Sequence, residues 1–277
     1  MLATTLVIFI AVALQLGFWE KTYLTLPKLG ILEPVPSDTE AEALSFGDKQ
    51  LYFRMQALNL QFMGDTWGRS TPLKDYDYKE VYKWLHFLDK FDPKSNMLPS
   101  AAAYYYSKTQ RPSDVKYLLD YIEERSYKDP EANWWWLSQS IYMANSILQD
   151  RPRAVRMAKV LRSVKADIPI WARQMEAFIQ EDLGDKEKSA DVMCDVIKNS
   201  KNFEKLPKED IDFFVYFFQE RLKTWKGKEN ELVAYCGKRE IARREEEARN
   251  TAASAPEAAA TVPVSVPAAT ATTVKGQ

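Results

Sequence analysis

The residue types that most often perform catalysis are scarce in this chain of 277 residues. His86 is its only histidine, so a zinc site with several imidazoles is excluded and a nucleophilic triad would depend on this one residue. Its neighbours Tyr82 and Asp89, at i−4 and i+3, form a polar flank, which favours an exposed helix position over a catalytic base. The two cysteines, Cys194 and Cys236, form no CxxC pair and need no bridge in a helical protein. We therefore expect no catalytic or metal-ligating residues and no cofactor.

One acidic string could bind a metal. Asp75-Tyr76-Asp77 is a DxD sequence, which in some glycosyltransferases holds a metal-bound sugar nucleotide. That role needs a strand-rich nucleotide fold, and the chain lacks the corresponding pattern. The preceding Ser70-Thr71-Pro72 and the acids more simply begin the helix that follows, because carboxylates are favourable near a helix N-terminus.

The overall composition excludes several function classes. The chain has 38 Lys and Arg against 39 Asp and Glu, a net charge of −1, whereas binding to nucleic-acid phosphates needs clustered cations. Only 9 residues are glycine, which makes a glycine-rich phosphate-binding loop improbable on composition alone. The sequence therefore indicates architecture more than chemistry, and we expect no nucleic-acid partner.

Aromatic residues are the more informative candidates for contact with a partner. Successive residues of a helix point about 100° apart, so Trp134-Trp135-Trp136 cannot all face one core. If Trp134 packs inside, Trp135 shares a stripe with Gln139 and Tyr142 on a second surface. The alternative is that Trp135 packs against a neighbouring helical unit.

A second candidate contact is the stretch Gly64-Asp65-Thr66-Trp67-Gly68-Arg69. Loops that expose an arginine beside an aromatic ring are common contact points, so Trp67 and Arg69 are candidates. The alternative is a structural wedge, in which Trp67 packs into the first helical pair and Arg69 pairs with a nearby acid.

The elements that position these residues recur along the chain. Four prolines follow apolar helical stretches at spacings of 37, 39 and 38 residues: Pro93, Pro130, Pro169 and Pro207. Each stretch has apolar or small residues at i, i+4 and i+7, which form one stripe of a helix. The sets are Val81/Leu85/Leu88, Val115/Leu119/Ile122, Ala154/Ala158/Leu161 and Ala190/Cys194/Ile197. With an aromatic-rich helix before each turn, the unit is helix, turn, helix and proline, repeated about every 37 residues.

This pattern resembles the tetratricopeptide repeat (TPR) family. Trp134, Leu137 and Ser138 match the family's first helix, and the small-residue stripes match its second helix. Val81 and Pro93 have the family's spacing of twelve, whereas Val115 to Pro130 and Ala154 to Pro169 are fifteen, which indicates longer second helices or a related hairpin repeat. The resemblance implies an all-α, right-handed superhelical array of helix-turn-helix repeats over residues 44–226.

In TPR proteins the first helices line a concave groove that grips partner segments. On that mapping the resemblance assigns the groove to residues from three first helices: Tyr105, Trp135, Gln139, Tyr142, Glu176 and Gln180.

The N-terminal segment carries a membrane signal. Residues 2–19 contain no charge, and about 20 apolar residues span a bilayer core. We expect an uncleaved transmembrane anchor over residues 1–19, with the body outside the cytoplasm. A cleaved signal peptide with Ala11-Val12-Ala13 at its cleavage site, or a buried core helix, are the alternatives.

The remaining segments follow from composition. Pro27, Pro34, Pro36 and Gly30 predict an extended linker over residues 20–43. Residues 227–250 become highly charged, which predicts a solvated capping helix. Residues 251–277 are rich in Ala, Thr, Val and Pro and should be disordered.

These features favour a membrane-tethered helical-repeat scaffold that binds a protein or peptide through an aromatic groove and assembles a membrane complex, rather than an enzyme. Two alternatives remain. One is an enzyme that acts on envelope polymers with carboxylates as acid and base. The other is a purely structural assembly subunit, whose Trp135 would be fully packed.

Overall fold

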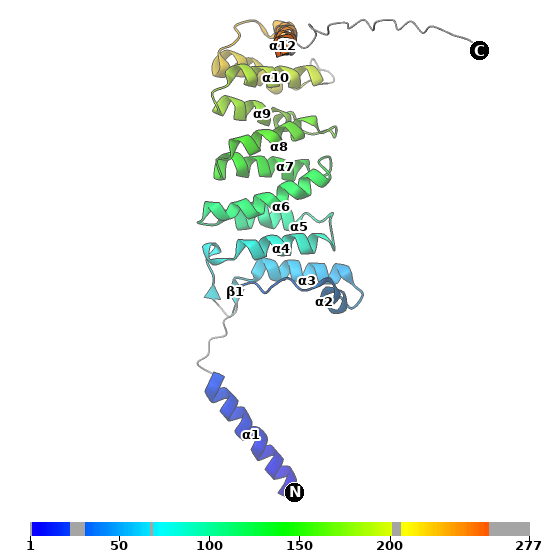
Figure 1. Ribbon diagram of the computed structural model, residues 1–277, viewed down its shortest axis with the longest axis vertical. Helices are drawn as coiled ribbons and strands as arrows, with labels where there is room; N and C mark the ends of the chain where they lie inside the picture. Colours follow the sequence, from blue (N-terminus) through cyan, green and yellow to red (C-terminus); the bar gives the residue numbers. More distant parts are fainter. Residues whose placement is uncertain (1, 23–30, 67–68, 201–205, 255–277) are drawn as a thin grey trace, which may run out of the picture. The chain divides into compact units, whose positions relative to one another are not determined.

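The computed structural model describes residues 2–22, 31–66, 69–200 and 206–254. These residues are mostly helical, which confirms the all-α class (Figure 1). The chain forms two compact units, residues 1–192 and 193–277. Each unit is described separately.

The first unit contains nine helices among the described residues and the start of a tenth. They are α1 (Leu2–Thr22), α2 (Asp38–Leu44), α3 (Lys49–Phe62), α4 (Tyr78–Asp89), α5 (Met97–Ser100), α6 (Val115–Lys128), α7 (Trp134–Tyr142), α8 (Arg151–Ser163), α9 (Ile170–Asp182) and α10 (Lys186–Asn199), the last of which crosses the unit boundary. The π-helical turns η2 (Ala101–Tyr105) and η5 (Met143–Ile147) extend α5 and α7. Short 3-10 turns precede α4 and α6 and follow η2.

The predicted second helices bury the predicted stripes. The stripe residues are at most 3% exposed in all four helices: α4 (Val81, Leu85, Leu88), α6 (Val115, Leu119, Ile122), α8 (Ala154, Ala158, Leu161) and α10 (Ala190, Cys194, Ile197). Within the first unit, consecutive helices from α6 to α9 contact one another in chain order, and α4 contacts α6 (Figure 1). Sequence periodicity thus locates these helices and their inward faces.

The DxD string acts as a helix cap, as expected. The Asp77 carboxylate accepts hydrogen bonds from the backbone N–H groups of Lys79 and Glu80, at 2.9 and 3.3 Å, and begins α4. Such a cap satisfies N–H groups that have no partner within the helix. Among the residues that the structure describes, no group of three or more His, Cys, Asp or Glu side chains could hold a metal ion.

Part of the segment that we expected to be an extended linker is folded. Residues 38–44 form α2, where Ser37 and Glu40 make a capping box that the proline content concealed. Before α2, the Glu33 carbonyl accepts a hydrogen bond of 2.7 Å from the Trp84 indole N–H, which fixes this segment to α4. Residues 23–30 of the expected linker lie outside the described residues, as do residues 255–277 of the tail that we expected to be disordered.

The stretch after α3 is a β-hairpin rather than an irregular loop. Strand β1 (Asp65–Thr66) pairs antiparallel with β2 (Arg69–Ser70), with Asp65 opposite Ser70 and Thr66 opposite Arg69. Gly64 precedes the hairpin, and a Cβ added at this position would clash with the Tyr76 hydroxyl. A side chain here would therefore displace Tyr76.

The second unit contains the end of α10, then α11 (Lys208–Tyr216) with its π-helical extension η7 (Phe217–Leu222), the 3-10 turn η8 (Glu229–Glu231) and α12 (Leu232–Ser254). The expected apolar stripe of α11 and η7 is mostly buried, with Phe214 and Phe218 fully enclosed. From Lys238 onward, most residues of α12 are exposed, in agreement with a solvated final helix.

The two cysteines are bonded to each other, contrary to our expectation. Cys194 of α10 and Cys236 of α12 form a disulfide that joins residues 42 positions apart. Lys198 forms an ion pair with Glu240 across the same two helices. The expectation failed because it considered only local CxxC spacing, whereas folding brings distant helices together.

α1 has the properties of a membrane-spanning helix. Residues 4–21 form an apolar window of 18 residues with mean hydropathy 1.4, and none of it is buried within the protein. This length and composition are sufficient to cross a bilayer core and are equally typical of a signal sequence. The exposure of α1 contradicts the alternative of a buried core helix.

Candidate functional site

The three consecutive tryptophans point to different surroundings, as the helical geometry requires. Trp136 is the buried member, and its indole N–H donates a hydrogen bond of 2.9 Å to the Asn96 side-chain oxygen. Trp134 is half-buried against the core, and Trp135 is 41% exposed. Trp135 therefore has an exposed face, but it also packs against residues of neighbouring helices, Tyr104 and Trp171, which was the alternative; Trp136 and not Trp134 is the most deeply packed of the three.

Trp135 belongs to a set of exposed aromatic residues, the aromatic row, which consists of Tyr104, Trp135 and Trp171. These side chains are 44%, 41% and 40% exposed. The Trp135 indole N–H donates to the Tyr104 hydroxyl at 2.9 Å, and the Trp135 ring meets the Trp171 ring edge-on, with centroids 6.1 Å apart. The row thus joins η2, α7 and α9 through direct side-chain contacts.

The surrounding core holds the aromatic row in place. The Tyr104 ring lies 6.0 Å from the buried Trp136 ring, and Trp134 contacts both Trp135 and Trp171, at 5.7 and 6.1 Å between centroids. Aromatic side chains have few rotatable bonds, so contacts on several sides leave little conformational entropy to lose on binding. The row is a preformed, largely apolar surface, within which the Trp135 N–H and the Tyr104 hydroxyl are bonded to each other.

Two of the three other predicted residues of α7 and η2 are exposed. Tyr142 is 54% exposed, and Gln139, between it and Trp135 on the same stripe of α7, is half-buried. Tyr105 follows Tyr104 in η2, is 43% exposed and packs edge-on against the buried Tyr106 ring. The structure therefore places Tyr105, Trp135 and Tyr142 at the surface, as predicted.

Glu176 and Gln180 do not line an open surface. They are 2% and 4% exposed, and the Glu176 carboxylate pairs with the Arg162 guanidinium of α8 at 3.0 Å. Their place in α9 was inferred from the family mapping, but the rotation of α9 turns this pair inward. Trp171, at the beginning of the same helix, is the exposed residue instead.

Trp67 lies outside the described residues, and of Arg69 the structure describes only the backbone in β2. Their expected role as contacts therefore stays a prediction.

Tyr104 and Trp171 were not among the predicted site residues, although a sequence signal for one of them existed. Trp135 and Trp171 are 36 positions apart, which is close to the period of about 37 residues that the sequence suggested. A comparison of residues one period apart in the sequence would have found this pair. Tyr104 is 31 positions before Trp135, and the π-helical turn η2 that carries it has no recognised sequence signal.

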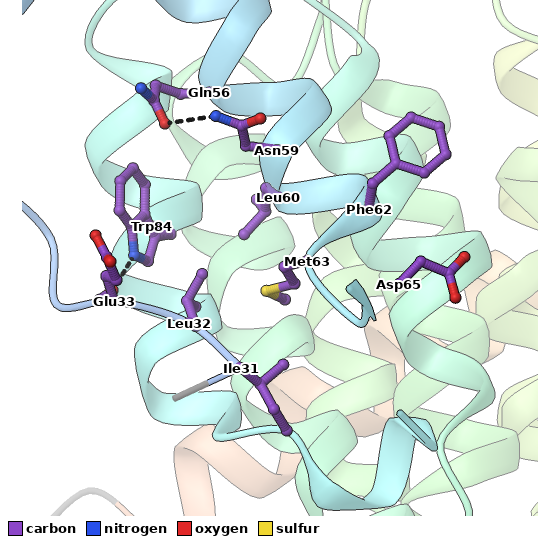
Figure 2. A pocket seen from close by; sticks show the side chains of 10 residues that line it. All are labelled: Ile31, Leu32, Glu33, Gln56, Asn59, Leu60, Phe62, Met63, Asp65 and Trp84. Atoms are coloured by element: carbon purple, nitrogen blue, oxygen red, sulfur yellow. Dashed lines mark hydrogen bonds between the residues drawn. The ribbon is translucent and has the colours of Figure 1, made fainter. Parts of the chain in front are cut away.

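A pocket of about 450 Å³ lies elsewhere in the first unit, between α3, α4 and the segment that precedes α2. Figure 2 shows that Leu60 and Met63 point toward the segment with Ile31 and Leu32, while the Trp84 indole closes one side. The acidic residues that line it, Glu33 and Asp65, are both exposed. Gln56 and Asn59 also line it, so polar and apolar side chains share the pocket.

The buried carboxylates are paired with arginines. Asp89 contacts the Arg125 guanidinium and accepts a hydrogen bond of 3.1 Å from the Tyr121 hydroxyl, while Glu176 pairs with Arg162. Burial raises the pKa of Asp89, while Arg125 acts in the opposite direction. These ion pairs stabilise the packing of the helices, and both carboxylates are paired with arginines of neighbouring helices.

His86 is half-buried, contrary to the expectation of an exposed position. Its ring packs edge-on against Tyr82 and Tyr121, and its Nε2 lies 3.2 Å from a Glu124 oxygen. Burial lowers the pKa of His86, and Glu124 partly opposes this shift. The sole histidine therefore belongs to the packing between α4 and α6.

Acidification is expected to lower the stability of the first unit, because His86 becomes protonated more readily in the unfolded chain than in the folded protein. Because the folded-state pKa is lowered, its contribution to stability is present above the ordinary pKa of about 6.5 and is lost as pH falls through the folded value. Thermal unfolding of purified protein between pH 8 and pH 5 should show a smaller loss of Tm in His86→Gln than in the parent. An equal loss in both proteins would contradict this assignment.

Comparison of the chain with protein-family models, with curated proteins and with solved structures finds no match.

Proposed function

We propose that this protein is a membrane-tethered helical-repeat scaffold that binds an extended segment of a partner protein on the aromatic row. The observation that carries the proposal is the continuous contact of Tyr104, Trp135 and Trp171, each about two-fifths exposed, across η2, α7 and α9. Tyrosine and tryptophan are enriched among residues that dominate binding energy at protein interfaces. The partner is a protein or peptide, and assembly of a membrane-associated complex is the expected outcome.

The repeat architecture in this proposal is a TPR-like array of helical pairs. Its support is the recurrence of one buried stripe in α4, α6, α8 and α10, together with the contacts between consecutive helices of the first unit. Repeat proteins of this kind bind partners by surface shape, since each pair of helices adds one strip of side chains to a common face.

The membrane part of the proposal places α1 in the bilayer as an uncleaved anchor and the body outside the cytoplasm. The apolar window of α1 supports the anchor. The Cys194–Cys236 disulfide supports an extracytoplasmic body, because structural disulfides persist in oxidising compartments and are rare in the cytosol. Attachment to the membrane raises the local concentration of the aromatic row near membrane-bound partners.

Photo-crosslinking in native membranes tests the binding surface. A photoreactive amino acid replaces Trp135 or Tyr142 in the full chain, and Tyr127 of α6, which is 41% exposed, provides a matched control away from the aromatic row. We expect a discrete adduct from Trp135 and Tyr142 that is absent from Tyr127. Equal labelling at all three positions would exclude the aromatic row as a specific contact.

Truncation of the neighbouring tryptophan gives the second test. Trp171→Ala removes a large exposed ring without changing the photoreactive position at Tyr142, and losing such an anchor commonly costs about 2 kcal/mol of binding energy, or roughly thirtyfold in affinity. The Tyr142 adduct should therefore decrease strongly, whereas Tyr127→Ala should leave it unchanged. An adduct that survives Trp171→Ala would contradict the proposed binding surface.

A further inference from the structure

α3 carries an exposed apolar stripe that the fold leaves uncovered. Leu51, Met55, Leu58 and Phe62 recur at i, i+4, i+7 and i+11 and are each 48–58% exposed. At 100° per residue they lie within about 60° of one another on the helix surface. We call these four residues the α3 stripe.

The side of α3 roughly opposite the stripe is already used for folding. Its buried residues are Tyr52, Phe53, Ala57 and Leu60, and α3 packs against α4. Helices that are apolar on two opposite sides are usually covered on both sides. The α3 stripe is therefore an exposed apolar face that the packing of α3 on α4 does not use.

The turn before α3 adds a further exposed aromatic ring. Phe46 is 93% exposed and adopts a left-handed backbone conformation, with φ of 48°. A bulky residue rarely adopts this conformation, so the fold holds the ring outward at some cost in backbone strain. Leu44, at the end of α2, is also more than half exposed.

The covalent chain ties α3 to the end of α1. Nine peptide steps separate Thr22 from Ile31, which limits the distance between their Cα atoms to about 30 Å. Ile31 and Leu32 line the pocket together with Leu60 and Phe62 of α3, and in Figure 2 Phe62 lies at its edge. When α1 is in a bilayer, the α3 stripe is thus held close to the lipid surface.

We propose that α3 docks on the membrane, with the α3 stripe and Phe46 inserted at the boundary between headgroups and acyl chains. This inference rests on the proposed membrane anchor. Lipid is favoured over a second protein because the tether supplies the bilayer to every copy at high effective concentration, whatever the protein concentration. Amphipathic helices with Leu and Phe on one face bind membranes in this way.

The charges near the stripe predict which lipids it accepts. Lys49 pairs with Glu42 at 3.3 Å, and Lys90 pairs with Asp38 at 3.0 Å, so two of the nearby cations are engaged by acids of α2. Arg54, which is exposed on α3 beside the stripe, is one further cation, so electrostatic attraction to anionic headgroups adds about 1 kcal/mol and insertion depends mainly on apolar burial. Docking should therefore be similar on neutral and anionic bilayers.

The test places a fluorescent label on the full chain reconstituted into phosphatidylcholine vesicles that contain acyl-chain quenchers. The label is attached at Leu58→Cys, and Lys159→Cys on the exposed side of α8 is the control; the native cysteines are bonded to each other and do not react. We expect strong quenching at position 58 and little at position 159. Replacing Met55 and Leu51 with Asp should reduce the quenching at position 58 at least about tenfold, while circular dichroism remains unchanged.

The outcomes separate this inference from the proposed function. Resistance of the floated protein to carbonate extraction reports on α1, because carbonate releases a helix that lies at the lipid surface and retains one that spans the bilayer. Protein that floats but shows no quenching at position 58, or equal quenching at positions 58 and 159, overturns the docking of α3 and leaves the anchor intact. Crosslinking between Leu58→Cys positions of two copies without lipid quenching identifies a second copy as the occupant instead. Protein that does not float overturns both.

Discussion

Arg125→Met is expected to destabilise the first unit by about 3–5 kcal/mol, because it leaves the Asp89 carboxylate buried without its cation. The same guanidinium donates to the carbonyls of Pro93 and Ser95, at 2.6 and 2.9 Å, and these acceptors also lose their donor. Denaturant unfolding of purified full-length protein, followed by circular dichroism, measures the loss. A cost below about 1 kcal/mol would show that water or rearrangement replaces Arg125.

The double variant Asp89→Leu with Arg125→Met is the matched control. Replacing both members of a buried ion pair with apolar residues is often neutral, so the part of the loss that comes from the unpaired Asp89 carboxylate should return. The part that comes from the Pro93 and Ser95 carbonyls and from the Tyr121 hydroxyl, which loses Asp89 as its acceptor, should remain. The pH dependence supplies a separate check. Burial raises the pKa of Asp89, so without Arg125 the folded state favours the protonated carboxyl; the penalty of Arg125→Met should be largest near pH 7 and decrease toward pH 4.

The positions of the helices followed from local sequence because a buried stripe needs only the 3.6-residue period of one helix. The four stripes that contain Val81, Val115, Ala154 and Ala190 are buried as predicted. The capping role of Asp77 was also predictable, since a cap depends on residues two and three positions away.

The site was harder to predict because exposure depends on how far each helix rotates against its neighbours. Each residue along a helix changes the direction of the side chain by about 100°, so Trp134 and Trp136 point about 200° apart, and the rotation of α7 decides which of them is buried. The same sensitivity turned Glu176 inward. The π-helical turns η2 and η5 add to the difficulty, because their wider turn breaks the period used to assign faces.

The α3 stripe shows a related limit. Leu51, Met55, Leu58 and Phe62 have the spacing of a core face, and so do the residues on the opposite side of α3. Sequence alone gives no reason to choose between two apolar faces. Packing against α4 decides which one the fold uses and leaves the other for an external contact.

Removing the Cys194–Cys236 disulfide is expected to lower the free energy of unfolding of the second unit by about 4 kcal/mol. This is the value expected when a crosslink that closes a loop of this length no longer restricts the unfolded chain. In Cys194→Ala with Cys236→Ala the unfolded chain gains freedom, while the folded helices lose a link between buried residues. Denaturant unfolding and hydrogen exchange of α12 measure the effect. A phosphine reductant should destabilise the parent protein and leave the double variant unchanged.

The control for the disulfide is Lys198→Gln, which removes an ion pair between the same two helices. Lys198 is about one-third exposed, so its pair with Glu240 should contribute no more than about 1 kcal/mol and the change should be small. Maleimide labelling of unfolded, unreduced protein taken from native membranes should add no label, and labelling after reduction should add two. Labelling without reduction would mean that the body resides in a reducing compartment, which would reverse the proposed orientation of α1.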